Sequence, residues 1–263
     1  MHNKNMTALR LGKQSVQIDE GELVSYSVSG HEFIHQKGSP GWRNADTEMF
    51  PIIGPTNEAN FKVMTPKSAA IQDQHGLLRE MRYEGIHQTE TKATFEKKYV
   101  AHTPVKNSKY PSKSTEEKLA WPYDFGFQKS FELTENGLAV VFNISGEKGM
   151  PFMLGYHPAF KLGSKKPIIS TQEKSITLDE VIAVGSRAFQ VPDCAQILLK
   201  DEKSLEITTQ GFGNFMLWTE VNNMVCIEPI TFYPYAVPQE QLHLGFEKLG
   251  TAPKTFSVFI KPF

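Results

Sequence analysis

Two strand-like runs joined by Asn136-Gly137 are the feature that most limits how this chain can fold. Residues 127–133 alternate between apolar and polar side chains, and residues 138–144 form a second, mostly apolar run. Period-two alternation is typical of a strand that buries one face. Asn-Gly between two such runs is the strongest short-range signal for a β-hairpin. The sequence therefore predicts a long antiparallel pair of strands at this place.

The rest of the chain continues the same pattern. Nowhere do apolar residues keep a 3.6-residue period long enough to predict a long helix. The 19 glycines and 16 prolines are spread between the runs instead of marking one linker, and no internal repeat is visible. We predict an all-β fold, a large antiparallel β-sandwich in which residues 1–263 form a single domain. Further strands are expected at residues 23–28, 93–100, 205–209, 215–220, 224–228 and 255–260, and an exposed loop or hairpin tip at residues 103–118.

Composition excludes several classes of partner. The chain has 28 basic and 29 acidic residues, so it lacks the basic surplus that drives binding to nucleic acid. No run approaches the roughly 18 apolar residues of a membrane-spanning helix, and the first ten residues lack the apolar core of a signal peptide. Cys194 and Cys226 have no metal-ligand spacing and are expected to be free, buried thiols. We expect a soluble, cytoplasmic protein with no nucleic-acid or membrane partner.

Two titratable side chains stand out because they follow apolar, strand-like runs. His157 precedes Pro158 at the end of such a run, where it is either a hydrogen-bonded core histidine or a group that transfers protons near neutral pH. Glu228 ends the apolar residues 224–227, so desolvation is expected to raise its pKa and improve it as a base. The alternative for Glu228 is a carboxylate that caps backbone amides.

His75 is the third candidate, since it is followed by the backbone-permissive Gly76. A metal site made of His75, His157 and Glu228 is a weaker alternative, because the three lie far apart in sequence and no His-x-His segment is present. We therefore expect neither a metal nor another cofactor. A nucleophile elbow and a phosphate loop are also missing from the sequence. The remaining histidines are expected to be ordinary surface residues: His2, His31, His35, His87, His102 and His243.

Around these residues the chain resembles the aldose 1-epimerase (mutarotase) family, particularly its shorter bacterial branch. The resemblance covers nearly the whole chain and keeps the order of the family's motifs. Its most specific part is Met150 to Phe160, which contains Gly-Tyr-His-Pro-Ala-Phe. The other matching blocks are residues 21–25, Trp42 with residues 49–54, residues 75–79, residues 121–123 leading to Asn136-Gly137, residues 217–219 and residues 227–229.

The resemblance implies both a fold and a reaction. The fold is a large antiparallel β-supersandwich of the galactose mutarotase-like type, with a sugar site on the concave face of one sheet. The activity is an isomerase of carbohydrate metabolism, which interconverts the α and β anomers of a hexose or related sugar without a metal. By this resemblance Glu228 is the general base on the C1 hydroxyl and His157 the general acid on the ring oxygen. His75 would stabilise the charge that develops there.

One departure from the family concerns sugar binding. Many relatives carry an arginine where this chain has Pro55, and Arg79 is either its substitute or part of a surface salt bridge. Asn214 is a weaker candidate for holding sugar hydroxyls. Trp218 either stacks on the sugar or fills the core.

The same departure keeps two other functions open. The chain could be a carbohydrate-binding protein that has lost catalysis. It could also be a hexose-phosphate mutarotase, which would need a basic rim, for instance from Arg79, Arg82 and Arg43. Whether the protein is a monomer or a homodimer is left open.

Overall fold

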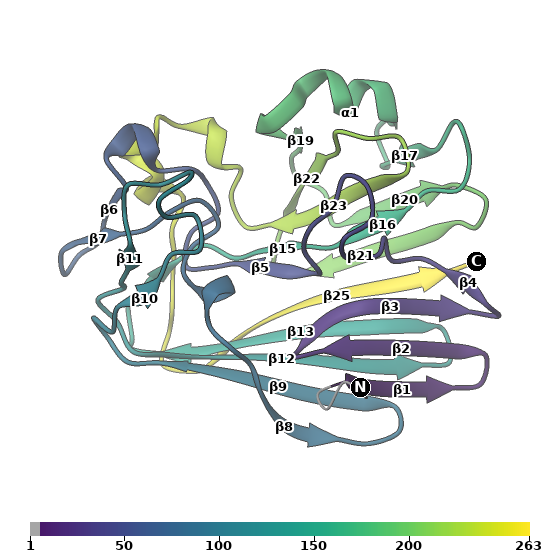
Figure 1. Cartoon of the computed structure of the whole chain (residues 1–263), viewed down its shortest axis with the longest axis horizontal. Helices are drawn as coiled ribbons and strands as arrows, with labels where there is room; N and C mark the ends of the chain where they lie inside the picture. Colours follow the sequence, from purple (N-terminus) through teal and green to yellow (C-terminus); the bar gives the residue numbers. More distant parts are fainter. Residues whose placement is uncertain (1–5) are drawn as a thin grey trace.

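Antiparallel β-strands dominate the computed structural model of the protein, which describes residues 6–263 (Figure 1). The largest sheet has nine strands, and its middle is the predicted hairpin. In spatial order they are β18 (Ser175–Thr177), β17 (Ile168–Ser170), β20 (Gln196–Lys200), β21 (Leu205–Gln210), β25 (Lys254–Pro262), β13 (Gly137–Gly146), β12 (Phe125–Thr134), β9 (Lys92–Tyr99) and β8 (Glu84–Gln88).

A second sheet of six strands packs against the first and carries most of the candidate site. Its order is β19 (Phe189–Val191), β22 (Asn214–Trp218), β23 (Met224–Ile230), β15 (Gly155–His157) and β5 (Thr47–Met49), and β16 (Ala159–Lys161) also pairs with β23. A third sheet is formed by β1 (Met6–Leu11), β2 (Gln14–Asp19), β3 (Glu22–Val28) and β4 (His31–Glu32).

Short elements cover the end of the molecule at the left of Figure 1 and the top of the second sheet. Three small ladders pair β6 (Lys62–Met64) with β7 (Ala69–Ile71), β10 (Val105–Lys106) with β11 (Lys118–Leu119), and β14 (Pro151–Phe152) with β24 (Glu247–Lys248). The helical turns are η1 (Asn57–Ala59), η2 (Leu78–Glu80), α1 (Leu178–Val184), η3 (Gly185–Arg187), η4 (Pro234–Ala236) and η5 (Gln239–Gly245). Among the described residues no helix is long and apolar enough to span a bilayer.

The predicted hairpin is present, although Gly137 already belongs to the second strand instead of the turn. Thr134 of β12 lies opposite Gly137 of β13, so that the turn falls on residues 135 and 136. Gly137 has a φ of +157°, and a Cβ there would lie 2.3 Å from the carbonyl oxygen of Ile260. A side chain at this position would therefore collide with the neighbouring strand β25.

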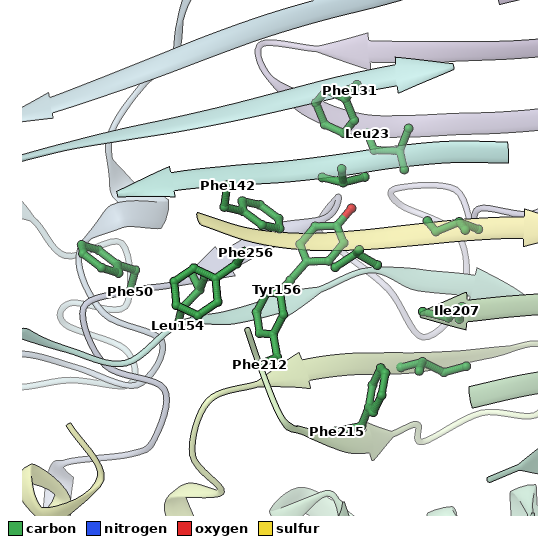
Figure 2. Close-up of a cluster of buried hydrophobic side chains, with 14 of the residues drawn as sticks. Leu23, Phe50, Phe131, Phe142, Leu154, Tyr156, Ile207, Phe212, Phe215 and Phe256 are labelled. Atoms are coloured by element: carbon green, nitrogen blue, oxygen red, sulfur yellow. The ribbon is translucent and has the colours of Figure 1, made fainter. Parts of the chain in front are cut away.

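Aromatic side chains fill the space between the two large sheets (Figure 2). Phe142 of β13 and Tyr156 of β15 come from opposite sheets, and their ring centroids are 5.1 Å apart. Phe256 of β25 also packs against Phe152 of the short strand β14, at 6.1 Å. Each fully buried phenylalanine contributes roughly 2–3 kcal/mol through the surface that it removes from water. This core therefore fixes how the six-stranded sheet sits on the nine-stranded one.

The prediction of an all-β sandwich is confirmed, and every predicted strand is present, although β22 ends at Trp218 instead of residue 220. The segment 103–118 is a hairpin whose ends are β10 and β11, as predicted. Many strands of two or three residues, and the seven-residue helix α1, were missed because they are too short to show a period. The surface prediction for His35 is wrong, since its side chain is buried, while His2 lies outside the described residues.

One charged side chain crosses the core. Lys129 of β12 is fully buried, and its Nζ lies 2.9 Å from Oδ2 of Asp46 and 2.5 Å from Oε1 of Glu48. Tyr156 donates a further hydrogen bond of 2.6 Å to Asp46. Burial acts to lower the pKa of Lys129, but the two carboxylates outweigh it and raise the pKa. The ammonium group therefore stays charged and joins the nine-stranded sheet to the chain around β5.

We expect Lys129→Met to destabilise the fold by about 3–5 kcal/mol, because it leaves two buried carboxylates without their cation. Methionine keeps most of the volume of the lysine stem, so the loss of stability comes from the missing charge and not from a cavity. The matched control is Lys92→Met, which breaks the exposed ion pair with Glu132 and should change stability by less than about 1 kcal/mol. Urea unfolding of both variants measures the difference. Equal, small effects would show that Lys129 does not hold the sheets together.

Candidate active site

Strand β23 places Glu228 on the floor of a cleft. Val225 and Ile227 point into the aromatic core, whereas Cys226 and Ile230 belong to clusters on the other face of the strand. Glu228 lies between these last two in the period-two order, so it shares their face. The strand is central in its sheet, between β22 on one side and β15 and β16 on the other (Figure 1). Glu228 is consequently held by backbone pairing on both sides and is only 1% exposed.

His157 is brought beside Glu228 by the neighbouring strand. It is the last residue of β15, and Pro158 separates it from β16. Its Nε2 lies 3.5 Å from Oε1 of Glu228. The ring of Trp42 lies against the imidazole, with centroids 5.1 Å apart and an interplanar angle of 32°. The histidine is 7% exposed, so it reaches the cleft by one edge only.

His75 approaches from a loop between β7 and η2. Its backbone has a φ of +74° and is followed by Gly76 at +71°. A Cβ on Gly76 would lie 2.2 Å from the carbonyl oxygen of Phe50, so only glycine fits. His75 itself adopts a left-handed conformation that is unfavourable for a side chain, a strain that is common at functional sites. The result is an imidazole whose ring centroid lies 5.4 Å from that of His157.

Arg79 of η2 determines which nitrogen of His75 carries the proton. Its Nη1 lies 2.8 Å from Nδ1 of His75, and its Nη2 donates a hydrogen bond of 2.5 Å to Oγ1 of Thr47. A guanidinium group can only donate, so Nδ1 of His75 must accept. In the neutral ring the proton then sits on Nε2. Arg79 is therefore part of the site and prepares His75 as a hydrogen-bond donor.

The four side chains open into one cleft of about 440 Å³, within the range of small-molecule sites. The tryptophans Trp42 and Trp218 form part of its wall, with ring centroids 6.2 Å apart. Its other lining residues include Asn44, Gln74, Lys113, Ser186, Glu220 and Tyr235.

Burial shifts the proton affinities of all three titratable groups. It raises the pKa of the Glu228 carboxyl well above its ordinary 4.5, although the charge of Arg79 acts in the opposite direction. It lowers the pKa of His157 to about 3, and Arg79 adds to this effect. It also lowers the pKa of His75 well below 6.5, with Arg79 again contributing. A pair of adjacent groups whose environments favour the neutral acid and the neutral base is typical of sites that transfer protons.

The structure thus brings five of the six candidate residues to one cleft. Trp218 is half-buried, and its ring centroid lies 6.3 Å from that of His157, so it lines the cleft as well as packing on the floor. Asn214 is not brought there. Its Oδ1 accepts a hydrogen bond from the backbone N–H of Asp193, and its Nδ2 donates one to the carbonyl of Thr231. We therefore do not retain Asn214 as a sugar-binding residue.

Three site residues were not identified from the sequence. Trp42 stood within a matching block, but nothing in the local pattern indicated its contact with His157. Thr47 belongs to a three-residue strand with no readable period. Lys113 lies in the predicted hairpin tip, where its polar neighbours hid any role. Arg43 and Arg82, considered for a basic rim, are not among the residues that line this cleft in the described part of the chain.

The candidate metal ligands in the structure differ from those considered from the sequence. The group whose ligand atoms lie within 4.8 Å of one another is His157, Cys226 and Glu228, without His75. Both oxygens of Glu228 and Nδ1 of His157 are buried and have no hydrogen-bond partner among residues 6–263. Buried polar atoms are nearly always satisfied in folded proteins. Side chains on the floor of the cleft can therefore hydrogen-bond a bound molecule or coordinate a metal ion.

Comparison with solved structures identifies the fold. A galactose mutarotase-like protein from Lactobacillus casei superposes with a TM-score of 0.79 at 17% identity, covering 98% of this chain and 100% of that one. A galactose mutarotase related enzyme from Lactobacillus acidophilus gives 0.74 at 18% identity, with 97% of each chain covered. An aldose epimerase homologue from C. elegans gives 0.69 at 9% identity, with 98% of each covered. The fold is that of the galactose mutarotase-like proteins.

The family is assigned from the sequence. Residues 62–196, just over half of the chain, match the family model of aldose 1-epimerase. This segment contains His75, Arg79 and His157. No curated protein matches the chain. The protein belongs to the aldose 1-epimerase family, an assignment that supports an isomerase-like enzyme acting on a small sugar.

The raised pKa of Glu228 predicts how stability depends on pH. Above 4.5 the unfolded chain loses the carboxyl proton while the folded chain keeps it, so the folded state binds more protons and stability falls as pH rises. Glu228→Gln removes this titration. We expect the stability of the variant, relative to wild type, to increase with pH above 4.5, by at most about 1.4 kcal/mol per pH unit.

Urea unfolding across this pH range measures the slope. The control is Glu90→Gln, which makes the same substitution at an exposed position. Parallel curves for Glu228→Gln and wild type would show that the pKa of Glu228 is not raised.

Proposed function

We propose that the protein interconverts the α and β anomers of a free hexose or related sugar, by general acid–base opening and closing of the ring. The observation that carries the proposal is the buried pair of His157 and Glu228, 3.5 Å apart and short of hydrogen-bond partners, on the floor of a sugar-sized cleft. The C1 hydroxyl and the ring oxygen are both bonded to C1, so an acid and a base must act close together. The short separation of the pair suits this requirement.

Glu228 is assigned as the base and His157 as the acid. Glu228 takes the proton of the C1 hydroxyl, His157 gives a proton to the ring oxygen, and the bond between C1 and that oxygen breaks to leave an open-chain aldehyde. Rotation about C1–C2 presents the other face of the carbonyl. Ring closure returns both protons in the reverse direction. The enzyme ends in its starting state, so no co-reactant is needed.

The proton balance of the pair fits this cycle. Burial disfavours an isolated carboxylate and an isolated imidazolium alike, so we expect Glu228 and His157 to hold one proton between them. The ionised pair and the neutral pair carry the same net charge. Burial favours the neutral pair, with the proton on Glu228, so the assigned cycle starts after that proton has moved to His157 and has left Glu228 as the acceptor.

His75 and Arg79 support the charge that develops on the sugar oxygens. Because Arg79 holds Nδ1 of His75 as an acceptor, Nε2 carries a proton that can be donated to the ring oxygen or a neighbouring hydroxyl. Donors fixed in advance stabilise a transition state better than donors that must first reorient. Trp42 and Trp218 offer flat apolar surfaces against which the C–H face of a pyranose can pack.

The charges around the cleft favour a neutral sugar over a sugar phosphate. Among the described residues that line it, Glu228 and His157 hold one proton between them and carry no net charge, and Glu220 opposes the charge of Lys113. Arg79 is already engaged with His75 and Thr47. A panel that pairs each free hexose with its 6-phosphate tests this choice. Faster turnover of the phosphates would instead support the hexose-phosphate mutarotase, and binding without turnover the non-catalytic protein.

Glu228→Gln should lower the rate of anomer interconversion by about 10²- to 10⁴-fold, the usual contribution of a positioned base. Polarimetry or NMR of freshly dissolved α-sugars gives the rate, and circular dichroism verifies the fold. Glu90→Gln, on the exposed surface, should keep wild-type activity. Full activity of Glu228→Gln would remove this residue from the mechanism.

Arg79→Lys should lower kcat/KM by about 10- to 100-fold, because a lysine cannot bridge His75 and Thr47 with two fixed donors. The control is Arg82→Lys, an exposed arginine three residues further along the chain, which should behave as wild type. A large effect of both substitutions, or of neither, would contradict the proposed role of the bridge.

A further inference from the structure

Cys226 has no part in the proposed reaction, yet it lies directly beside the acid–base pair. It is two residues before Glu228 on β23, on the same face of the strand. Its neighbours across the sheet are Ala159 of β16 and Trp218 of β22. The thiol is fully buried and free. A sulfur atom is thereby fixed beneath the cleft, next to an imidazole and a carboxylate.

The separations among these groups match one kind of ligand. The ligand atoms of His157, Cys226 and Glu228 all lie within 4.8 Å of one another, and the nitrogen and oxygen are 3.5 Å apart. A tetrahedral zinc ion, with bonds of about 2.0–2.3 Å, holds its ligand atoms about 3.3–3.8 Å from each other. Small side-chain rotations therefore suffice to bring the three atoms onto one ion.

The donor set selects the type of cation. Mg²⁺ and Ca²⁺ prefer oxygen ligands, whereas a thiolate with an imidazole and a carboxylate suits Zn²⁺ or a similar thiophilic ion. Both oxygens of Glu228 lack hydrogen-bond partners among residues 6–263, so they are not already committed to the protein. His157 and Glu228 line the cleft and Cys226 lies behind them. The fourth ligand of the ion would then be a water from the cleft, as in zinc sites with three protein ligands.

We infer that a thiophilic divalent cation such as Zn²⁺ binds to His157, Cys226 and Glu228 and inhibits the enzyme. Binding expels the proton of the Cys226 thiol to solvent. The ion takes the lone pairs of His157 and Glu228 through which protons would pass to and from the sugar. The inhibition rests on the proposed function, but the binding of the ion does not.

Titration of the metal-free protein with Co²⁺ tests the binding, because a cobalt–thiolate bond has its own near-ultraviolet absorption. We expect one ion per chain with this band, its loss in Cys226→Ser and Cys226→Ala, and its persistence in Cys194→Ala. Zn²⁺ should displace the cobalt, and loss of the sulfur ligand should weaken binding by more than about tenfold. Absence of the band, or its persistence without Cys226, would overturn the inference.

A second measurement is independent of whether the Cys226 variants fold. In Cys194→Ala the remaining cysteine is Cys226, so X-ray absorption of its zinc complex should show one sulfur at about 2.3 Å. A shell of nitrogen and oxygen alone would contradict the site.

Activity measurements then test whether the bound ion inhibits the enzyme. Zn²⁺ should inhibit wild type, and Cys226→Ala should need more than about ten times as much. Equal inhibition of the two proteins would overturn the inhibitory role. If no sugar is turned over, the proposed function fails while the cobalt and zinc results still decide the binding site.

Discussion

The buried ion pairs of Lys129 are the interaction on which the site depends. Lys129 belongs to the nine-stranded sheet, and its partners Asp46 and Glu48 flank Thr47 at the edge of the six-stranded sheet. Thr47 lies opposite His157 in the strand register and accepts a hydrogen bond from Arg79. A charge buried in the core thus sets the position of β5, and β5 aligns the groups that face the cleft. Removing it would disturb the candidate site from behind, without changing any side chain that lines the cleft.

The chemistry of the site follows from placing ionisable groups where water cannot solvate them. Glu228 and His157 gain their shifted proton affinities from burial, which is a cost to the fold. The aromatic core between the sheets offsets that cost. Strands of the six-stranded sheet carry His157 and Glu228, whereas loops carry His75 and Lys113. Under the proposed function, motion during the reaction is therefore expected in the opened sugar and in the loops more than in this pair.

The sequence predicted those parts of the molecule that repeat or that stand in a motif. Eight strands were found because alternation or a continuous apolar run over five or more residues is visible without a structure. His75, His157 and Glu228 were found because each stands beside glycine, proline or an apolar run. The bridge through Thr47 and the place of Cys226 beside the pair depend on strand register, and the contact of Trp42 with His157 depends on the path of the loop before β5. Where the paired strands are far apart in the chain, no turn fixes their register, so the sequence does not show which residues face one another. For Asn214 the position along the chain indicated a role in sugar binding, but its side chain is hydrogen-bonded to the backbone away from the cleft.

The hairpin formed by β10 and β11 has a consequence for how this scaffold can diversify. Its loop brings Lys113 to the mouth of the cleft, and Asn107 and Lys109 anchor it to Asp73, two residues before His75. The loop contributes to the rim but to no strand of the large sheets. Under the proposed function, exchanging residues 110–113 for segments of other length or charge would therefore alter which sugars enter, while the anchor at Asn107 and the groups at the floor of the cleft keep their places. Selectivity and reactivity are separately mutable in this molecule, which makes the hairpin the natural target for a library that seeks new substrates.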